Sequence, residues 1–246
     1  MAAEGGHSPL EQFVWKPIVP AEIGGVDVSF SNSSLFMTIT VLVATLFLVL
    51  GIRRSAIIPG RWQVAVELSY EFIAGLLKDT VGAEGRKYFP IIFTLFMFVL
   101  LGNLLGMVPY SFTFTSHIIV TFGMAFTIFI GVTILGFAKH GMHFFTFFAP
   151  PGTPVVMLPL LVPIEIISYL SRPISLSVRL FANMLAGHTL IKVIAGFIPV
   201  LGVIFGVLPL ALVVALTGLE ILIAFLQAYV FAILTCLYIN DAIHLH

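Results

Sequence analysis

The chain is dominated by apolar runs that are long enough to cross a lipid bilayer. The first covers residues 34–52, and two more cover 88–110 and 118–138. The last two, residues 155–198 and 203–239, are about twice as long as the ~20 residues of a perpendicular helical span. The runs are continuous and not alternating, which favours helices over a membrane β-barrel. Because 60% of the residues are hydrophobic and only 9% are charged, a soluble globular domain is excluded.

We therefore expect an all-α integral membrane protein with about five transmembrane helices and one amphipathic surface helix. The surface helix is residues 62–82, where four charged residues interrupt the apolar ones at helical spacing: Glu67, Glu71, Lys78 and Asp79. A helix packed beneath others would show the same pattern. The excess length of the last two runs predicts a strongly tilted hairpin over residues 155–239, a kink near Pro163 or Pro173, or both.

The basic residues predict the orientation of the spans. Three arginines follow the first run, Arg86 and Lys87 precede the second, and Lys139 follows the third. The positive-inside rule places these positions on the inner side, with the N-terminus outside and the C-terminus inside. Residues 1–33 then form an outer arm, either a flexible tail or a segment docked on the membrane face. Residues 34–246 are expected to form a single transmembrane domain, since they show no internal repeat.

A stripe of polar residues follows one face of the fourth run. At 100° per residue, six side chains fall within about 80° of arc: Glu165, Ser168, Arg172, Ser175, Arg179 and Asn183. Close helix packing is an alternative explanation for the serines. An arginine at the centre of a membrane helix costs roughly 2.5–3.5 kcal/mol on insertion scales. Each of the two arginines is therefore expected to have a structural or functional role. For Arg172 we expect pairing with Glu165 or with lipid headgroups.

Arg179 is the clearest candidate functional residue. No acidic residue lies one helical turn away on either side, so its counter-ion must come from another helix or another subunit. An intramembrane charge of this kind indicates a functional site.

The last run supplies a second polar pattern. Glu220 and Gln227 are seven residues apart and share one helix face. A buried carboxylate needs a partner or a proton, and His188 on the preceding run is a candidate partner. A histidine and a carboxylate together can take up and release protons near neutral pH. Packing alone remains an alternative for His188, and structural hydrogen bonding remains one for Gln227.

The predicted direction of the two arms places protonatable groups on both sides of Arg179. Glu165 lies toward the inner side, whereas His188 and Glu220 lie toward the outer side. This order is typical of two half-channels separated by a fixed positive charge.

At these residues the sequence resembles subunit a of the rotary F-type ATP synthase, the membrane stator of its proton motor. The motifs are "RPISLSVRLFANMLAGHTL" (172–190), "LEILIAFLQAYVFAILTCLYI" (219–239) and "LLGMVPYSFTFTSH" (104–117). The resemblance covers nearly the whole chain. The sequence departs from the family pattern in two ways: His188 and Glu220 exchange the residue types of many bacterial members, as in mitochondrial relatives, and Ala182 replaces the commoner glycine.

The resemblance implies roles for seven residues in proton translocation. Arg179 matches the essential arginine that faces the carboxylates of the rotating c-ring, and Asn183 and Gln227 match its polar neighbours. His188 and Glu220 match a pair on the outer aqueous path, and Glu165 with Ser168 match the inner path. The exchanged pair keeps one acid and one imidazole, so we expect its chemistry to persist.

The resemblance also implies partners and a location. These partners are the c-ring, the peripheral-stalk b subunits, the other Fo and F1 subunits, and lipid. The expected location is the bacterial inner membrane, with the mitochondrial inner membrane as the alternative. No cofactor, metal or nucleic acid is expected, and the chain is expected not to be an enzyme, because it lacks the glycine-rich G-x-x-x-x-G-K-[ST] loop that cradles nucleotide phosphates.

Two rival classes remain to be weighed. A self-contained proton-coupled secondary transporter could use Arg179 and Glu165, but it predicts internal repeats. A haem or quinone enzyme would need axial histidines within the bundle, for which only His117 and His188 are near membrane depth. His140 and His143 alone are a weak metal signal.

Overall fold

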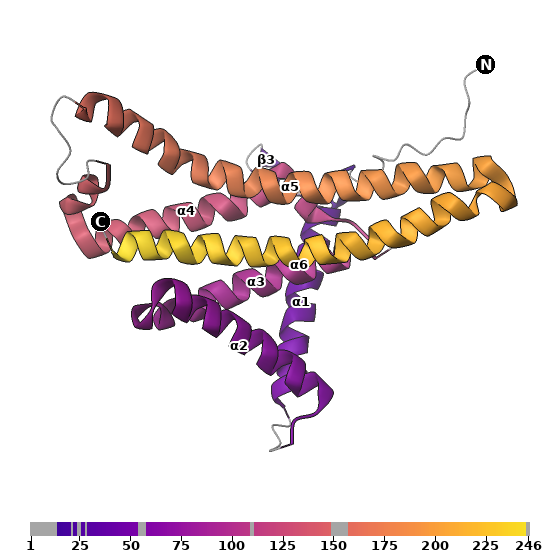
Figure 1. The fold of residues 1–246 in the computed structure, drawn as a ribbon, viewed down its shortest axis with the longest axis horizontal. Helices are drawn as coiled ribbons and strands as arrows, with labels where there is room; N and C mark the ends of the chain where they lie inside the picture. Colours follow the sequence, from indigo (N-terminus) through magenta and orange to yellow (C-terminus); the bar gives the residue numbers. More distant parts are fainter. Residues whose placement is uncertain are drawn as a thin grey trace. The chain divides into compact units, whose positions relative to one another are not determined.

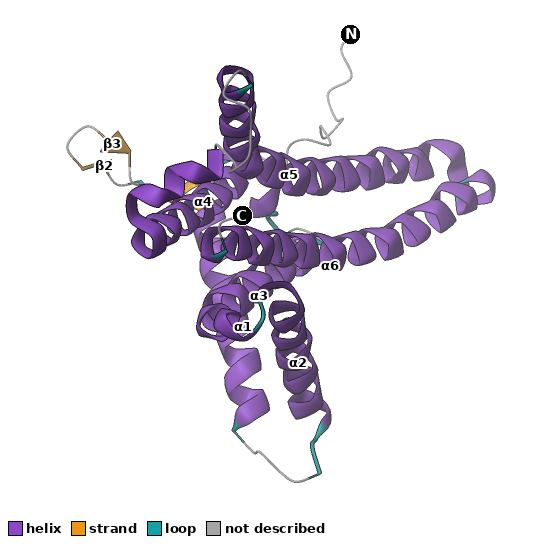
Figure 2. Ribbon diagram, turned by 60° about the vertical axis from the view of Figure 1, so that its left-hand side comes forward, coloured by secondary structure: helices purple, strands orange, loops and turns teal. Residues whose placement is uncertain are grey.

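The computed structural model describes residues 14–20, 22–23, 26–27, 29–53, 58–108, 111–148 and 157–244. Helices make up most of this part of the chain (Figure 2). In chain order they are α1 (Asn32–Ile52), α2 (Arg61–Val81), α3 (Phe89–Gly106), α4 (Ile118–His140), α5 (Leu158–Phe205) and α6 (Val207–Ile243). Three short 3₁₀ helices accompany them: η2 (Ala83–Tyr88), η3 (Phe114–Ser116) and η4 (Gly141–Phe148).

The expected all-α membrane fold is confirmed. Among the described residues, five stretches are long and apolar enough to span a membrane: Asn32–Ile52, Ala83–Gly106, Ile118–Phe145, Leu158–Gly202 and Val207–Ile243. The remaining helix, α2, is the predicted amphipathic one. It buries a stripe at spacings of seven and four residues, formed by Val66, Ile73, Leu77 and Val81.

The N-terminal arm contains strands that the sequence analysis did not predict. β1 (Pro17–Val19) pairs antiparallel with β4 (Phe30–Ser31), and β2 (Glu22–Ile23) pairs with β3 (Val26–Asp27). Strands of two or three residues are too short to produce a recognisable alternation, which explains the omission. The N-terminal end of α1 is tied to this arm, because the Asn32 backbone N–H donates to the Lys16 carbonyl (3.1 Å).

The two long arms differ in detail from the prediction. α5 continues through Pro199, and its one non-helical residue is Gly202, at φ 70°. A positive φ of this size favours glycine, so the non-helical break falls there. The φ and ψ angles at Pro163 and Pro173 are helical, and the kink expected near one of them stays a prediction. With 48 residues α5 is far longer than a perpendicular span requires, which implies tilt.

The residues group into two compact units, and each is described by itself. The first comprises Met1–Phe47, Met97–His117 and Leu180–Ala228; the second comprises Leu48–Phe96, Ile118–Arg179 and Tyr229–His246. The helices α1, α3, α5 and α6 contribute residues to both. Figure 1 shows the chain coloured along its sequence, with the end of α5 turning back directly into α6.

The first unit is packed around the C-terminal part of α3. Phe114 of η3 is 1% exposed and lies against Gly102, where an added Cβ would come within 2.5 Å of the ring. Leu180 and Met184 of α5 and Ala224 of α6 are fully buried in the same unit. Small residues at such positions let helix backbones approach closely.

The second unit is rich in aromatic contacts. Tyr169 of α5 lies beside Phe129 of α4, with 4.9 Å between ring centroids, and beside Phe148 of η4 at 5.6 Å. Its hydroxyl also shares a hydrogen bond with the Thr133 hydroxyl of α4 (2.7 Å). These contacts fix the first part of α5 against α4 and η4.

Candidate functional site

A histidine and a glutamate from the two long helices meet inside the first unit. The His188 Nδ1 of α5 contacts the Glu220 carboxylate of α6, and both side chains are buried. Gly187 makes this approach possible, because an added Cβ would lie 2.7 Å from the Glu220 Oε1. The His188 Nε2 has no hydrogen-bond partner among the described residues. The structure thus joins the two residues that the sequence suggested as partners.

Two buried side-chain amides lie close to the part of α6 that carries Glu220, one on α6 itself and one on α3. Gln227 is buried, two turns beyond Glu220. Asn103 of α3 is completely buried, and its Nδ2 donates to the Ala224 carbonyl between those two residues (3.4 Å). The sequence analysis gave Asn103, which stands within the apolar run of residues 88–110, no role. An amide alone in such a run is the signal that could have singled it out, because buried polar groups need partners.

Arg179 lies on α5 and belongs to the second unit. Its side chain is exposed, and among the described residues of that unit no carboxylate forms an ion pair with it. The guanidinium is therefore presented at the surface of this unit with its donors available. That its counter-ion comes from another subunit stays a prediction.

The expectation that Arg172 pairs with Glu165 is wrong. Arg172 Nη1 donates to Asp241 Oδ2 of α6 at 2.9 Å, and not to Glu165. The sequence analysis missed Asp241 because it lies 69 residues away, near the C-terminal end of α6, where an acid is unremarkable in sequence. Helical spacing identifies partners only within one helix.

Three other predicted residues form no side-chain hydrogen bond or ion pair with one another in the described part of the chain. Glu165 is half-buried and Ser168 is exposed, and Ser168 uses its backbone carbonyl to accept from the Ser171 hydroxyl (2.7 Å). Asn183, in the first unit, is half-buried. Their roles stay predictions.

His117 is packed against an aromatic ring. Its ring stacks on Phe112 at 5.0 Å between centroids, and burial lowers the pKa of the imidazole. The neutral form is therefore favoured at neutral pH.

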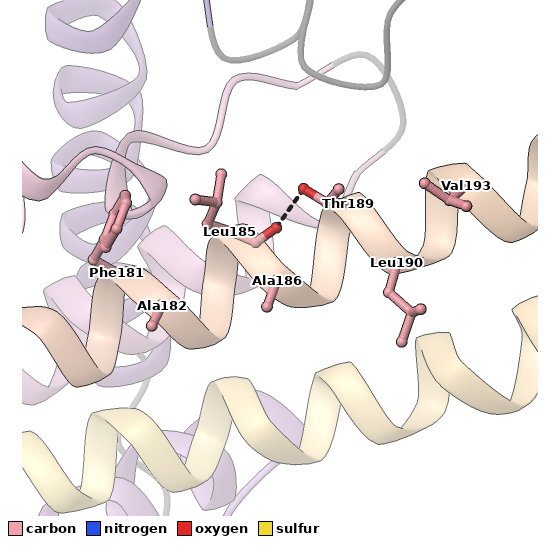
Figure 3. Close-up of a pocket in the computed structure, with 7 residues that line it drawn as sticks. All are labelled: Phe181, Ala182, Leu185, Ala186, Thr189, Leu190 and Val193. Carbon is pink, nitrogen blue, oxygen red and sulfur yellow. Dashed lines mark hydrogen bonds between the residues drawn. The ribbon is translucent and has the colours of Figure 1, made fainter.

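A shallow apolar groove follows Arg179 along α5. It is lined by Phe181, Ala182, Leu185, Ala186, Thr189, Leu190 and Val193, all within the first unit (Figure 3). The Thr189 hydroxyl is turned back onto the Leu185 carbonyl (2.7 Å), so the groove offers no free donor from that side chain. Ala182 and Ala186 are one turn apart and exposed, which leaves room for a neighbouring helix to come close.

Together these features define a polytopic helical membrane protein with a buried histidine–carboxylate pair and an arginine exposed within a membrane-spanning helix. The chain belongs to the ATP synthase A chain family, whose sequence model matches residues 34–240.

The relatives of the chain are similar along almost their whole length. ATP synthase subunit a of Rhodospirillum rubrum is 61% identical over 240 residues, which cover 98% of this chain and 100% of the relative. The same-named protein of Paramagnetospirillum magneticum is 56% identical over 245 residues, with 97% and 99% covered. That of Rhizobium etli is 59% identical over 244 residues, with 97% and 98% covered.

Proposed function

We propose that this chain is the proton-conducting membrane stator of an F-type ATP synthase, with Arg179 as a fixed electrostatic gate between two offset half-channels. The observation that carries the proposal is the combination of a buried His188–Glu220 pair with an arginine that has no carboxylate partner among the described residues of its own unit. Membership of the ATP synthase A chain family supports it.

In this mechanism, His188 and Glu220 serve the outer half-channel. The pair can accept a proton on one group and release it from the other, since the His188 Nδ1 and the Glu220 carboxylate are in contact. The His188 Nε2 is buried and has no hydrogen-bond partner among the described residues, so this ring nitrogen remains for a proton-transfer partner. Glu165 and Ser168 serve the inner half-channel, and Asn183 and Gln227 supply polar groups for proton transfer, as the family resemblance implies.

Arg179 acts on carboxylates of a partner, the c-ring. A ring carboxylate facing lipid must be protonated, because a bare charge there is too costly. Beside a guanidinium the ionised form is favoured, so the proton leaves through one half-channel. Reprotonation from the other half-channel then allows the carboxylate to return to lipid. Arginine keeps its own proton, so it also blocks a direct leak between the half-channels.

The apolar groove on α5 supports this partner. The exposed alanines Ala182 and Ala186 allow a ring helix to pass close to α5. Each elementary charge that crosses 100 mV supplies about 2.3 kcal/mol, which the rotor delivers to ATP-forming subunits. The chain itself is then a non-catalytic subunit of the bacterial inner membrane. Its N-terminus is outside and its C-terminus inside, and the b subunits hold it to the peripheral stalk.

The test is ATP-driven proton pumping by inverted membrane vesicles that carry Arg179→Ala in the assembled complex. We expect pumping to vanish while assembly is normal, because no other group would stabilise the ionised ring carboxylate. Passive proton conductance is measured in the same vesicles and should persist or rise. Wild-type pumping by Arg179→Ala would overturn the gate assignment.

A further inference from the structure

Arg172 lies in a cage of one carboxylate and three aromatic rings. Its guanidinium carbon is 5.0 Å from the centroid of Tyr238, 5.3 Å from that of Tyr169 and 5.6 Å from that of Phe147. The Asp241 carboxylate closes the cage at 2.9 Å. All five residues belong to the second unit. An arginine that is both paired and surrounded by aromatic faces has little rotational freedom.

The cage joins separate elements of the fold. Phe147 comes from η4, Tyr169 comes from α5 itself, and Tyr238 and Asp241 come from the last turns of α6. Tyr169 is tied in turn to α4 through the Thr133 hydroxyl. The first part of α5 is therefore held against three other elements at one level, which prevents it from turning about its own axis.

The register of α5 carries this constraint to Arg179. The two arginines are seven positions apart in the helix. Arg179 therefore points within about 20° of Arg172 and lies about 10 Å further along the helix axis. The helix has no non-helical residue between them. Any rotation of α5 at Arg172 would thus swing Arg179 by the same angle.

We propose that the Arg172–Asp241 cage is a positioning device, which sets the direction in which Arg179 faces its partner. This rests on the proposed function of Arg179 as the gate. The residue type fits the task, because a planar guanidinium can stack on rings and donate to a carboxylate at the same time, whereas the compact ammonium of lysine cannot do both equally well. Arg172 and Asp241 are positioning residues and do not touch the transported proton.

The experiment compares variants of the assembled complex in inverted vesicles, with protons pumped per ATP hydrolysed as the readout. We expect Arg172→Gln and Asp241→Asn to lower this ratio about tenfold, since misplacing a reacting group by about 1 Å can cost up to 10²-fold. Arg172→Lys should lose less. The exchange Arg172→Asp with Asp241→Arg should recover part of the ratio, which general destabilisation would not explain.

The matched control is the other ion pair of the same unit. Lys139 Nζ contacts Glu84 Oε2 at 2.7 Å, and this pair is not on α5. We expect Glu84→Gln to leave the ratio unchanged. If Arg172→Gln fails to assemble, Asp241→Asn carries the test, because it keeps the arginine and its aromatic contacts.

The outcomes separate this proposal from the gate itself. If Arg179→Ala abolishes pumping while Arg172→Gln and Asp241→Asn keep the full ratio, the cage has only a structural role and the positioning proposal is overturned. If Arg179→Ala pumps normally, the gate proposal fails. A low ratio in both single variants, with recovery in the exchanged pair, supports positioning.

Discussion

At the scale of single residues, the absence of a side chain at Gly187 is what allows the carboxylate of Glu220 to reach His188. The oxygen of Glu220 occupies the space where a Cβ would project from α5. A buried ionisable pair needs such contact, because each group would otherwise be left without a partner in an apolar surrounding. The glycine therefore belongs to the proton-handling pair as much as the two titratable residues do.

Gly187→Ala tests this dependence. The added methyl group would displace Glu220 from His188, and overpacking of this kind costs about 1–3 kcal/mol. We expect ATP-driven proton pumping to fall severalfold, because the His188 ring and the Glu220 carboxylate would no longer be in contact.

Gly196→Ala is the control for that experiment, since it lies on the same helix with open space around its Cβ. It should pump as the wild type does. Equal losses in the two variants would show that alanine in α5 is harmful in general, and that contact with Glu220 is not the cause.

At the scale of the elements, the spacing of residues along the sequence predicted the helices and their faces. It did not predict the contacts between helices. The five spans, the amphipathic α2 and the shared face of Glu220 and Gln227 follow from periodicity. The contact of His188 with Glu220 could be anticipated, because each is the conspicuous polar group in its apolar run. The partner of Arg172 could not, because Asp241 is one of several polar residues at a helix end and only tertiary packing selects it.

The break in α5 shows the same limit. Prolines mark expected kinks, but a proline in a helix costs one backbone hydrogen bond, which packing can offset. Gly202 instead adopts a backbone conformation that other residues avoid. The strands of the arm escaped prediction for a different reason, since two or three residues are too few to show an alternation.

The packing of α4 against η4 gives an element-scale prediction. An added Cβ at Gly136 would lie 2.4 Å from the ring of the buried Phe144, whereas nothing lies within 4 Å of one at Gly131 on the same helix. We expect Gly136→Ala to destabilise the chain by about 1–2 kcal/mol, the cost of overpacking less the better helix propensity of alanine. Gly131→Ala should be neutral or stabilising.

The measurement is denaturant-induced unfolding of the two purified variants in lipid nanodiscs. Gly131→Ala corrects for the propensity term, so the difference between the variants isolates the contact with Phe144. If both variants unfold at the same denaturant concentration, the Phe144 ring relaxes freely and η4 is not held tightly against α4.

At the scale of the whole molecule, the N-terminal arm is fastened where α1 begins. The Asn32 side chain donates through Nδ2 to the Val14 carbonyl (3.1 Å) and accepts at Oδ1 from the Lys16 N–H (3.3 Å). These bonds hold Trp15 level with the first turn of a membrane-spanning helix. Trp15, Ile18 and Val19 are about half exposed, and a lone two-stranded hairpin is only marginally stable in water.

These contacts favour docking of the arm on the membrane face over a flexible tail, and tryptophan is the residue best suited to that depth. The sequence holds two tryptophans, so Trp62→Phe leaves Trp15 as the sole reporter and Trp15→Phe leaves Trp62 on α2. In nanodiscs with brominated lipids we expect the emission of both single-tryptophan chains to be quenched, because both rings then lie at the bilayer interface.

The variant Asn32→Ala tests whether the hydrogen bonds of Asn32 hold the N-terminal arm in place or whether the arm only lies near α1. Asn32→Ala removes the two side-chain hydrogen bonds to the arm and leaves the chain of α1 intact. In the Trp62→Phe background it should weaken the quenching of Trp15, while in the Trp15→Phe background it should leave Trp62 unchanged. Quenching of Trp15 by aqueous iodide in place of brominated lipid would show that the arm stands in water, and the fastening at Asn32 would then serve only to cap α1.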